Sequence, residues 1–133
     1  MSGREVVSLP GGGGNIPLSP GIKIGNLLFA SGQVGVDRKT RDVPDDVGEQ
    51  TRNCFRNLGA VLEAAGVGFE DVVKVHVFLT DMDDFRTMNE AYREFFPIDP
   101  PARTTVGIKG LVSEKFKVEI DLIAAIGEGE CDC

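Results

Sequence analysis

The chain has 133 residues, a formal net charge of −7 at pH 7 and 26% charged residues. This length is typical of one domain that buries its own core, so we expect a single domain over residues 1–133. The negative charge disfavours general nucleic-acid binding, because such a chain and a phosphate backbone repel each other. No run of about 20 apolar residues predicts a membrane span, and the first residues lack a signal peptide's apolar stretch.

The cysteines and the single histidine limit the chemistry further. Three cysteines cannot all pair within one chain, so we expect reduced thiols and a cytoplasmic protein. A metal site built on several histidines is excluded, because His76 is the only one in the sequence. Cys131 and Cys133 stand in an acidic tail, residues 127–133, which we expect to be frayed. Neither a metal nor a cofactor is predicted.

The first third of the chain predicts strands separated by a glycine-rich loop. Residues 5–9 and 22–33 are expected to be strands, and the second contains the turn-prone pair Gly25-Asn26. Residues 10–21 are rich in glycine and proline and predict a loop. A phosphate-binding loop would end in Gly-Lys-Ser or Gly-Lys-Thr at the start of a helix, and this segment has no such ending.

Two amphipathic helices are expected downstream. The first begins near Asp46, which has capping-box spacing to Glu49, and Gly66 is placed to end it. Its apolar residues recur at steps of three, four and seven: Val47, Cys54, Leu58, Val61, Leu62 and Ala65. The second helix, over residues 83–96, has an apolar stripe of Phe85, Met88, Tyr92, Phe95 and Phe96. Both patterns are typical of helices that pack on a core, so Cys54 is interpreted as a core residue.

Strands over residues 72–79, 103–108 and 118–126 complete the element order β-β-α-β-α-β-β. This order predicts a two-layer α+β fold with both helices on one face of the sheet. The other face would carry a mixture of charged and apolar side chains: Lys74, His76, Phe78, Glu119, Asp121, Ile123 and Ala125. Such a face suits a subunit interface that encloses polar pockets better than bare solvent.

Arg103 and Glu119 are the candidates for chemistry. Arg103 begins a predicted strand after two prolines, and its planar guanidinium can hold a carboxylate through two parallel hydrogen bonds. A surface arginine in a weak salt bridge is the competing interpretation. Glu119 lies mid-strand among apolar residues, and a partly desolvated carboxylate there could position or deprotonate a water. A charge on an exposed sheet face is its competing interpretation.

The distance between these two residues leads to a hypothesis about subunits. In a simple hairpin of residues 103–108 and 118–126, Arg103 would oppose a residue near Ala124 and lie roughly 16 Å from Glu119. One small substrate could not contact both. Either the strands pair differently, or the site combines Arg103 of one chain with Glu119 of another, and we favour the second arrangement.

Six segments appear in the order of a known family. They are Phe29-Ala-Ser-Gly-Gln-Val34, Asn57-Leu-Gly-Ala-Val-Leu-Glu-Ala-Ala-Gly66, Val73-Lys-Val-His-Val-Phe78, Phe95-Phe96, Pro101-Ala-Arg-Thr-Thr-Val106 and Val118-Glu-Ile120. Over about residues 16–126 the chain resembles the reactive-intermediate deaminase family, RidA or YjgF. The combination of Ser-Gly-Gln, Pro-Ala-Arg-x-x-Val and a final Val-Glu-Ile strand is the most specific part of the resemblance.

The resemblance implies a chorismate-mutase-like α+β fold assembled as a homotrimer, with pockets between subunits. It implies hydrolysis of 2-imino acids, formed from enamines such as 2-aminoacrylate, to 2-keto acids and ammonia, without a cofactor. The family's carboxylate-binding arginine corresponds to Arg103 and its water-positioning glutamate to Glu119. Thr105, Ser31 and Asn89 match further pocket positions of the family.

One position departs from the family pattern. Members of the well-studied deaminase group carry a tyrosine in the loop before the first long strand, where this chain has Leu18. Leu18 therefore favours an alternative function, a regulatory trimer that binds a small carboxylate without turning it over. A ribonuclease, a label that some relatives carry, is disfavoured by the charge of −7 and the lack of a basic stripe. The predicted partner is a 2-imino acid or another carboxylate, with no nucleic acid and no membrane.

Overall fold

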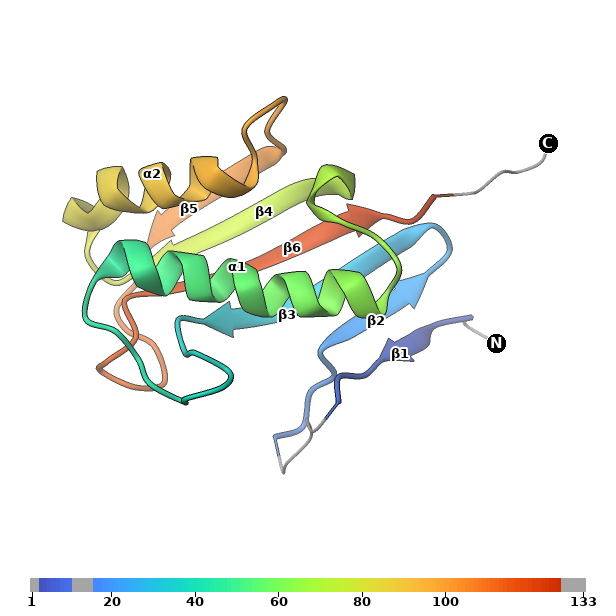
Figure 1. Cartoon of the computed structure of the whole chain (residues 1–133), viewed down its shortest axis with the longest axis horizontal. Helices are drawn as coiled ribbons and strands as arrows, with labels where there is room; N and C mark the ends of the chain where they lie inside the picture. The colour runs from blue at the N-terminus through green and yellow to red at the C-terminus, as the bar shows by residue number, and fades with distance from the viewer. Residues whose placement is uncertain (1–2, 11–15, 128–133) are drawn as a thin grey trace.

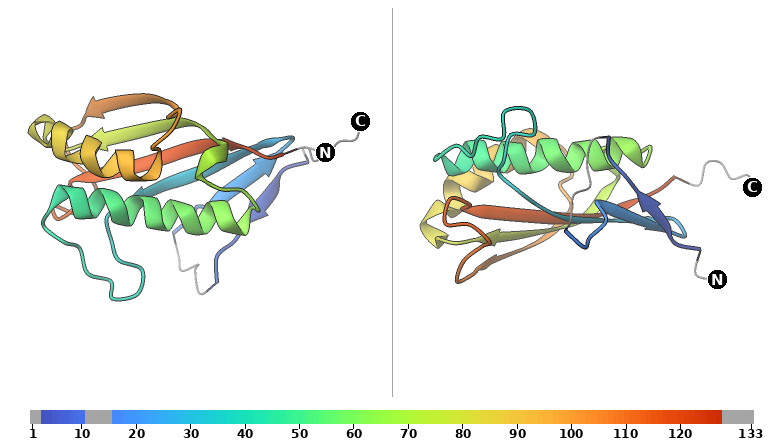
Figure 2. Two further views of the ribbon diagram at one scale, coloured as in Figure 1. Left: turned by 45° about the horizontal axis from the view of Figure 1, so that its top comes forward. Right: turned by 90° about the horizontal axis from the view of Figure 1, so that it is seen from below.

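The computed structural model describes residues 3–10 and 16–127. Its strands are β1 (Glu5–Val7), β2 (Gly21–Ile24), β3 (Leu27–Val34), β4 (Val72–Leu79), β5 (Ala102–Gly107) and β6 (Val118–Ala125). Its helices are α1 (Val47–Ala64) and α2 (Phe85–Phe95), with 3-10 turns at Phe69–Asp71 and Met82–Asp84. The six strands form one sheet in the order β1-β2-β3-β6-β4-β5, and both helices lie on one face of it (Figures 1 and 2). The predicted α+β fold is confirmed.

The predicted strand over residues 22–33 is in fact two strands. Gly25 has a φ of 59°, and the turn that it forms with Asn26 joins β2 and β3 into an antiparallel hairpin. Positive φ at a two-residue hairpin turn matches the right-handed twist of the strands, and glycine adopts it without steric cost. The described element order is therefore β-β-β-α-β-α-β-β.

The core lies between the helices and the sheet, as the apolar patterns predicted. The largest fully buried apolar side chains come from both layers: Leu28, Phe55, Leu58, Leu62, Leu79, Met88, Ile120 and Leu122. Cys54 is fully buried among them, and burial raises the pKa of its thiol, so its assignment to the core is confirmed. Cys131 and Cys133 of the predicted tail and the glycines of residues 11–14 lie outside the described residues.

Both helix boundaries follow from their capping residues. The Asp46 side chain accepts a hydrogen bond from Glu49 N at 2.8 Å, which satisfies one of the free amides at the start of α1. At the other end Gly66 has a φ of 83°, one residue beyond the C-cap. α2 begins at Phe85, two residues later than predicted, because Asp81 caps a 3-10 turn in front of it.

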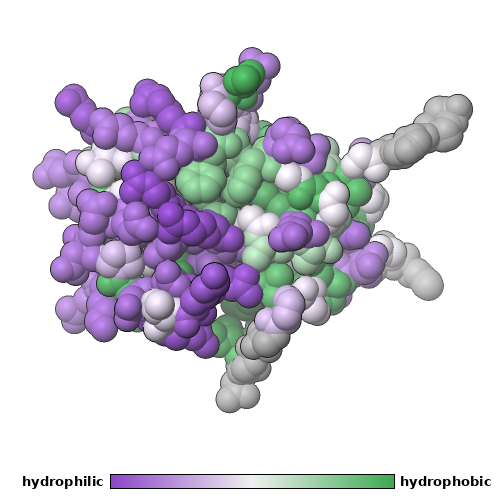
Figure 3. Space-filling view, viewed as in Figure 1, coloured by the Kyte–Doolittle hydropathy of each residue, from purple (hydrophilic) through white to green (hydrophobic). Residues whose placement is uncertain are grey.

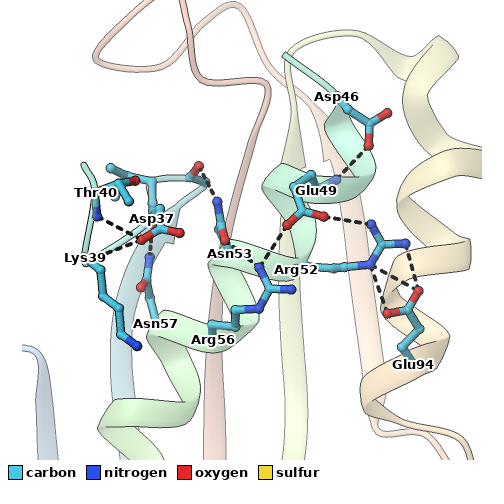
Figure 4. Close-up of polar contacts among 12 residues, drawn as sticks. Asp37, Lys39, Thr40, Asp46, Glu49, Arg52, Asn53, Arg56, Asn57 and Glu94 are labelled. Carbon is cyan, nitrogen blue, oxygen red and sulfur yellow. Dashed lines mark hydrogen bonds and ion pairs between the residues drawn. The ribbon is translucent and has the colours of Figure 1, made fainter. Parts of the chain in front are cut away.

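Buried side-chain amides of α1 hold the loop that follows β3. Asn57 Nδ2 donates to Val36 O at 3.0 Å, and Asn53 Nδ2 donates to Gly35 O at 3.2 Å (Figure 4). On the outer side of α1, Arg52 joins Glu49 and bridges to Glu94 of α2. This part of the helix face is mainly hydrophilic, at the left of Figure 3. The amides therefore set where β3 ends and where α1 packs on the sheet.

Gln50 connects three segments and carries a stability prediction. It is fully buried, donates to Pro44 O at 2.7 Å and Lys115 O at 2.9 Å, and accepts from Lys117 N at 2.8 Å. Gln50→Leu leaves these three backbone groups unpaired, so we expect a loss of about 2–4 kcal/mol in the free energy of unfolding, measured by urea titration. The matched control is Glu63→Gln on the exposed surface of the same helix, which should keep the wild-type midpoint. Equal midpoints for both variants would contradict the prediction.

The face of the sheet opposite the helices is uncovered in the single chain (Figure 2, right). Along β6 buried residues alternate with half-buried ones, and the half-buried set points to this open face. Register places His76 of β4 beside Asp121, and Phe78 beside Glu119. The predicted composition of this face is confirmed. No helix in the described part of the chain is long and apolar enough to span a membrane.

Candidate active site

Arg103 lies on the helix side of β5, against two aromatic rings of α2. Its Cζ atom is 4.7 Å from the centroid of the Tyr92 ring and 5.6 Å from that of Phe85. Cross-strand pairing with Val75, a core residue, sets this orientation. A guanidinium stacked on aromatic faces keeps its N–H donors free at its edge, where a carboxylate can approach. α2 therefore positions the side chain that the sequence singled out.

A cavity of about 600 Å³ adjoins this arginine. Asn89, Tyr92 and Arg103 line it together with the proline-rich segment after α2. The hydroxyls of Tyr92 and Thr105 are buried and have no hydrogen-bond partner among the described residues. Thr105 follows Arg103 by two residues and so lies on the same face of β5. Three predicted site residues (Asn89, Arg103 and Thr105) thus gather on one side of the sheet.

Glu119 lies on the open face of β6, with its carboxylate over Gly32 of β3. A Cβ atom built on Gly32 would overlap Glu119 Oε2, so the carboxylate occupies space that a side chain at residue 32 would take. Burial, and next to it the charge of Asp121, raises the pKa of Glu119 above its usual value. A carboxylate with a raised pKa is a stronger base than an ordinary one and, once protonated, keeps its proton to higher pH.

Ser31 ties the loop that contains Leu18 to the same strand as Gly32. Its Oγ atom donates to Ser19 O at 2.6 Å, and its backbone N–H donates to Pro20 O at 2.9 Å. Leu18 is 60% exposed in the single chain. A second group of predicted site residues, Leu18, Ser31 and Glu119, therefore lies at β3 and β6. Ser31 holds the loop that contains Leu18, and Glu119 supplies a carboxylate.

The two groups do not meet within one chain. β4 lies between β5 and β6, so the hairpin considered from the sequence does not form. β5 instead runs parallel to β4, with Arg103 beside Val75 on the helix side. Glu119 is on the opposite face of the sheet. One small substrate cannot contact Arg103 and Glu119 of the same chain.

Sequence reasoning missed two parts of this geometry. The sequence marks Gly32 only as part of a family motif, because the carboxylate packed against it belongs to Glu119, which is distant in sequence. Tyr92 was interpreted as a core residue, and it is buried, but its ring also supports Arg103. The contact between Arg103 of β5 and the aromatic residues of α2 could have been predicted from the β4-α2-β5 order, because a crossover helix packs over the strands that it connects.

Fold and site together define a class of α+β proteins with a six-stranded sheet, two helices on one face, and an arginine and a glutamate on opposite sides. Residues 14–126 match the family model described as Endoribonuclease L-PSP. The chain therefore belongs to the YjgF/RidA family, which its sequence motifs predicted.

Relatives of this chain carry several names. A RutC family protein of Pyrococcus horikoshii is 46% identical over 109 residues, 81% of this chain and 86% of the relative. A protein of Schizosaccharomyces pombe named mmf2, mitochondrial, is 48% identical over 111 residues, 82% and 87% of the two chains. The 2-iminobutanoate/2-iminopropanoate deaminase of Escherichia coli is 40% identical over 111 residues, 81% and 86%. A cytoplasmic location stays a prediction, because one relative is named mitochondrial.

Solved structures match over nearly the whole chain. The crystal structure of the YjgF gene product of Escherichia coli has a TM-score of 0.83 at 37% identity and covers 91% of this chain and 98% of that one. Escherichia coli TdcF with bound serine has a TM-score of 0.81 at 36% identity, with coverage of 92% and 97%.

Proposed function

We propose that the protein is a deaminase that hydrolyses 2-imino acids to 2-keto acids and ammonia, in sites formed between the subunits of a homotrimer. The observation that carries the proposal is the division of Arg103 and Glu119 between the two faces of the sheet. Relatives named 2-iminobutanoate/2-iminopropanoate deaminase, at 36% and 40% identity, support the reaction. Serine bound to a relative supports a small carboxylate as ligand.

In this mechanism Arg103 of one subunit binds the substrate carboxylate through its guanidinium edge. Glu119 of a second subunit accepts a proton from a water as the water oxygen attacks the carbon of the protonated C=N group. The tetrahedral carbinolamine then takes that proton from Glu119 on its nitrogen. As the C–N bond breaks, the hydroxyl proton passes to the departing ammonia, so that the 2-keto acid and ammonium are released. Holding the substrate against an aimed water and supplying a base are sufficient for this reaction, since imines hydrolyse unaided in water.

The open sheet face supports the assembly. Phe29 is 42% exposed and Val106 is 40% exposed, and both belong to strands that have no helix over their outward side chains. Covering this face with a second copy would bury those apolar side chains and further desolvate Glu119. Covering would also bring residues of another chain to Glu119. Arg103, Asn89 and Thr105 of the same chain cannot reach it, because they lie on the other side of the sheet.

Mixing two inactive variants tests the shared site. Arg103→Ala and Glu119→Gln chains, unfolded together in equal amounts and refolded, should form mixed trimers with about a quarter of the wild-type turnover, because one interface in four combines an intact Arg103 with an intact Glu119. Each variant refolded alone is the control and should be inactive. A mixture as inactive as the separate variants, with the trimer intact, would contradict a site shared between chains.

Carboxylate binding without turnover is the second candidate function, and Leu18 is the observation that favours it. A leucine at this exposed loop position lacks the hydroxyl that the well-studied deaminases of the family carry there. Under this function Glu119→Gln would leave ligand affinity unchanged and there would be no imine turnover to lose. Product release by the wild-type protein therefore separates the two functions.

A further inference from the structure

The chain's single histidine lies beside the glutamate of the proposed site. His76 Nδ1 is 2.6 Å from Asp121 Oδ1, across the β4–β6 pair. Asp121 and Glu119 are two residues apart on the same face of β6, so their side chains are separated by about 7 Å. The mechanism proposed above uses neither His76 nor Asp121.

The charged surroundings of this cluster come from few elements. Among the residues that the structure describes, β4 contributes Lys74 and His76 to the open face, and β6 contributes Glu119 and Asp121. The Lys74 ammonium is turned toward β5, where it donates to Thr104 Oγ1 at 2.9 Å.

The strand and helix that pack closest to Glu119 add no further charge. On β3 it faces Gly32 and is in register with Val34, neither of which ionises. Beneath the sheet, α1 places the Cys54 thiol, which burial keeps neutral. The charge nearest to Glu119 on its own face is therefore the His76–Asp121 pair.

We propose that His76 is a positioning residue for proton transfer: its imidazolium neutralises Asp121 and thereby sets the pH at which Glu119 gains or loses its proton. The inference rests on the proposed function for its catalytic consequence, but the coupling itself is a property of one ion pair, His76–Asp121, and of its distance from Glu119. Histidine suits this role because its charge changes between pH 5 and 8.

The sign of the coupling follows from Coulomb's law. While His76 is protonated, the pair is neutral and Glu119 experiences little of the Asp121 charge. Removing the imidazolium leaves Asp121 uncompensated, so Glu119 holds its proton to higher pH. Removing the carboxylate of Asp121 leaves His76 as a lone cation, so Glu119 loses its proton at lower pH. Two unit charges about 7 Å apart on a partly solvated face predict shifts of about 0.5–1 pH unit.

Carbon-13 NMR of glutamate side-chain carboxyls tests the coupling directly in the assembled protein. The Glu119 signal is assigned by its loss in Glu119→Gln, and its titration midpoint is followed in four proteins: wild type, His76→Gln, Asp121→Asn and the double variant. We expect the midpoint to rise in His76→Gln, to fall in Asp121→Asn and to return near the wild-type value in the double variant. His76→Lys keeps a positive charge at this position, so its Glu119 midpoint should lie close to that of the wild type. This variant serves as the test if His76→Gln folds poorly.

Two outcomes would overturn the inference: single variants that shift the midpoint in the same direction, or shifts below about 0.2 pH unit in folded proteins. The pH profile of kcat/KM for imine hydrolysis should move with the NMR midpoint. A protein that shows the expected titrations but hydrolyses no imine refutes the proposed function and leaves the coupling intact. A protein that hydrolyses imines with the same pH profile in all four forms refutes the coupling alone.

Discussion

Replacing Arg103 with alanine is expected to lower kcat/KM for 2-imino acids by about 10²–10⁴-fold, because two charge-assisted hydrogen bonds to the substrate carboxylate are lost. The loss should be mainly in KM, and affinity for the 2-keto acid product should fall with it. Arg103→Lys keeps the charge but not the planar fork, and the Tyr92 and Phe85 rings no longer stack on a guanidinium. We expect the lysine variant to lie between alanine and wild type.

Steady-state kinetics and calorimetric titration with a 2-keto acid measure these effects. Arg86→Ala is the matched control, since Arg86 is an exposed arginine of α2 that does not line the cavity. It should behave as wild type. If folded Arg103→Ala bound the keto acid with unchanged affinity, Arg103 would be excluded from carboxylate binding.

Glu119→Gln is expected to lower kcat by about 10²–10⁴-fold, because the amide cannot accept the proton. Ligand affinity should stay near that of the wild type, since the amide keeps the shape of the side chain. In the wild type, kcat/KM should fall as the pH drops through the raised pKa of Glu119. Single-turnover assays at a series of pH values measure both effects. Turnover that survives in the glutamine variant would show that another group is the base.

The same substitution should stabilise the fold near neutral pH. Glu119 has a pKa that is higher in the folded chain than in the unfolded one, so the folded state binds its proton more tightly. The contribution of this group to stability is therefore greatest below the unfolded value of about 4.5 and is lost as the pH rises through the folded value. Glu119→Gln avoids that loss, so its melting temperature should exceed that of wild type at pH 7–8. Equal melting temperatures at pH 7–8 would contradict this sign.

The sequence predicted the elements better than their pairing. Helix caps at Asp46 and Gly66 are local signals, and period-two alternation along β6 is local as well, so these predictions were close to the structure. The neighbour of β5 is set by the crossover through α2, and no residue of β5 itself specifies it. Assuming a hairpin with β6 therefore failed, and the separation of Arg103 from Glu119 rests instead on their positions on opposite faces of the sheet.

The candidate site divides in the same way. Arg103 and Asn89 could be predicted to share a cavity, because each matches a family motif and α2 leads directly to β5. The packing of Glu119 against Gly32 could not be predicted from the sequence. It depends on the register of β3 against β6 and on a bulge between Ala30 and Gln33. No single segment of the chain specifies a register between strands that are distant in sequence.

The measurement that tests the central claim most directly is release of 2-keto acids from enzymatically generated 2-imino acids, with short and long side chains in parallel, against the spontaneous rate. We expect the wild-type protein to accelerate release and Arg103→Ala to remove the acceleration, with the side-chain series showing which substrates Leu18 accepts. No acceleration with any imine by a folded, assembled wild-type protein would contradict the deaminase and leave carboxylate binding without catalysis.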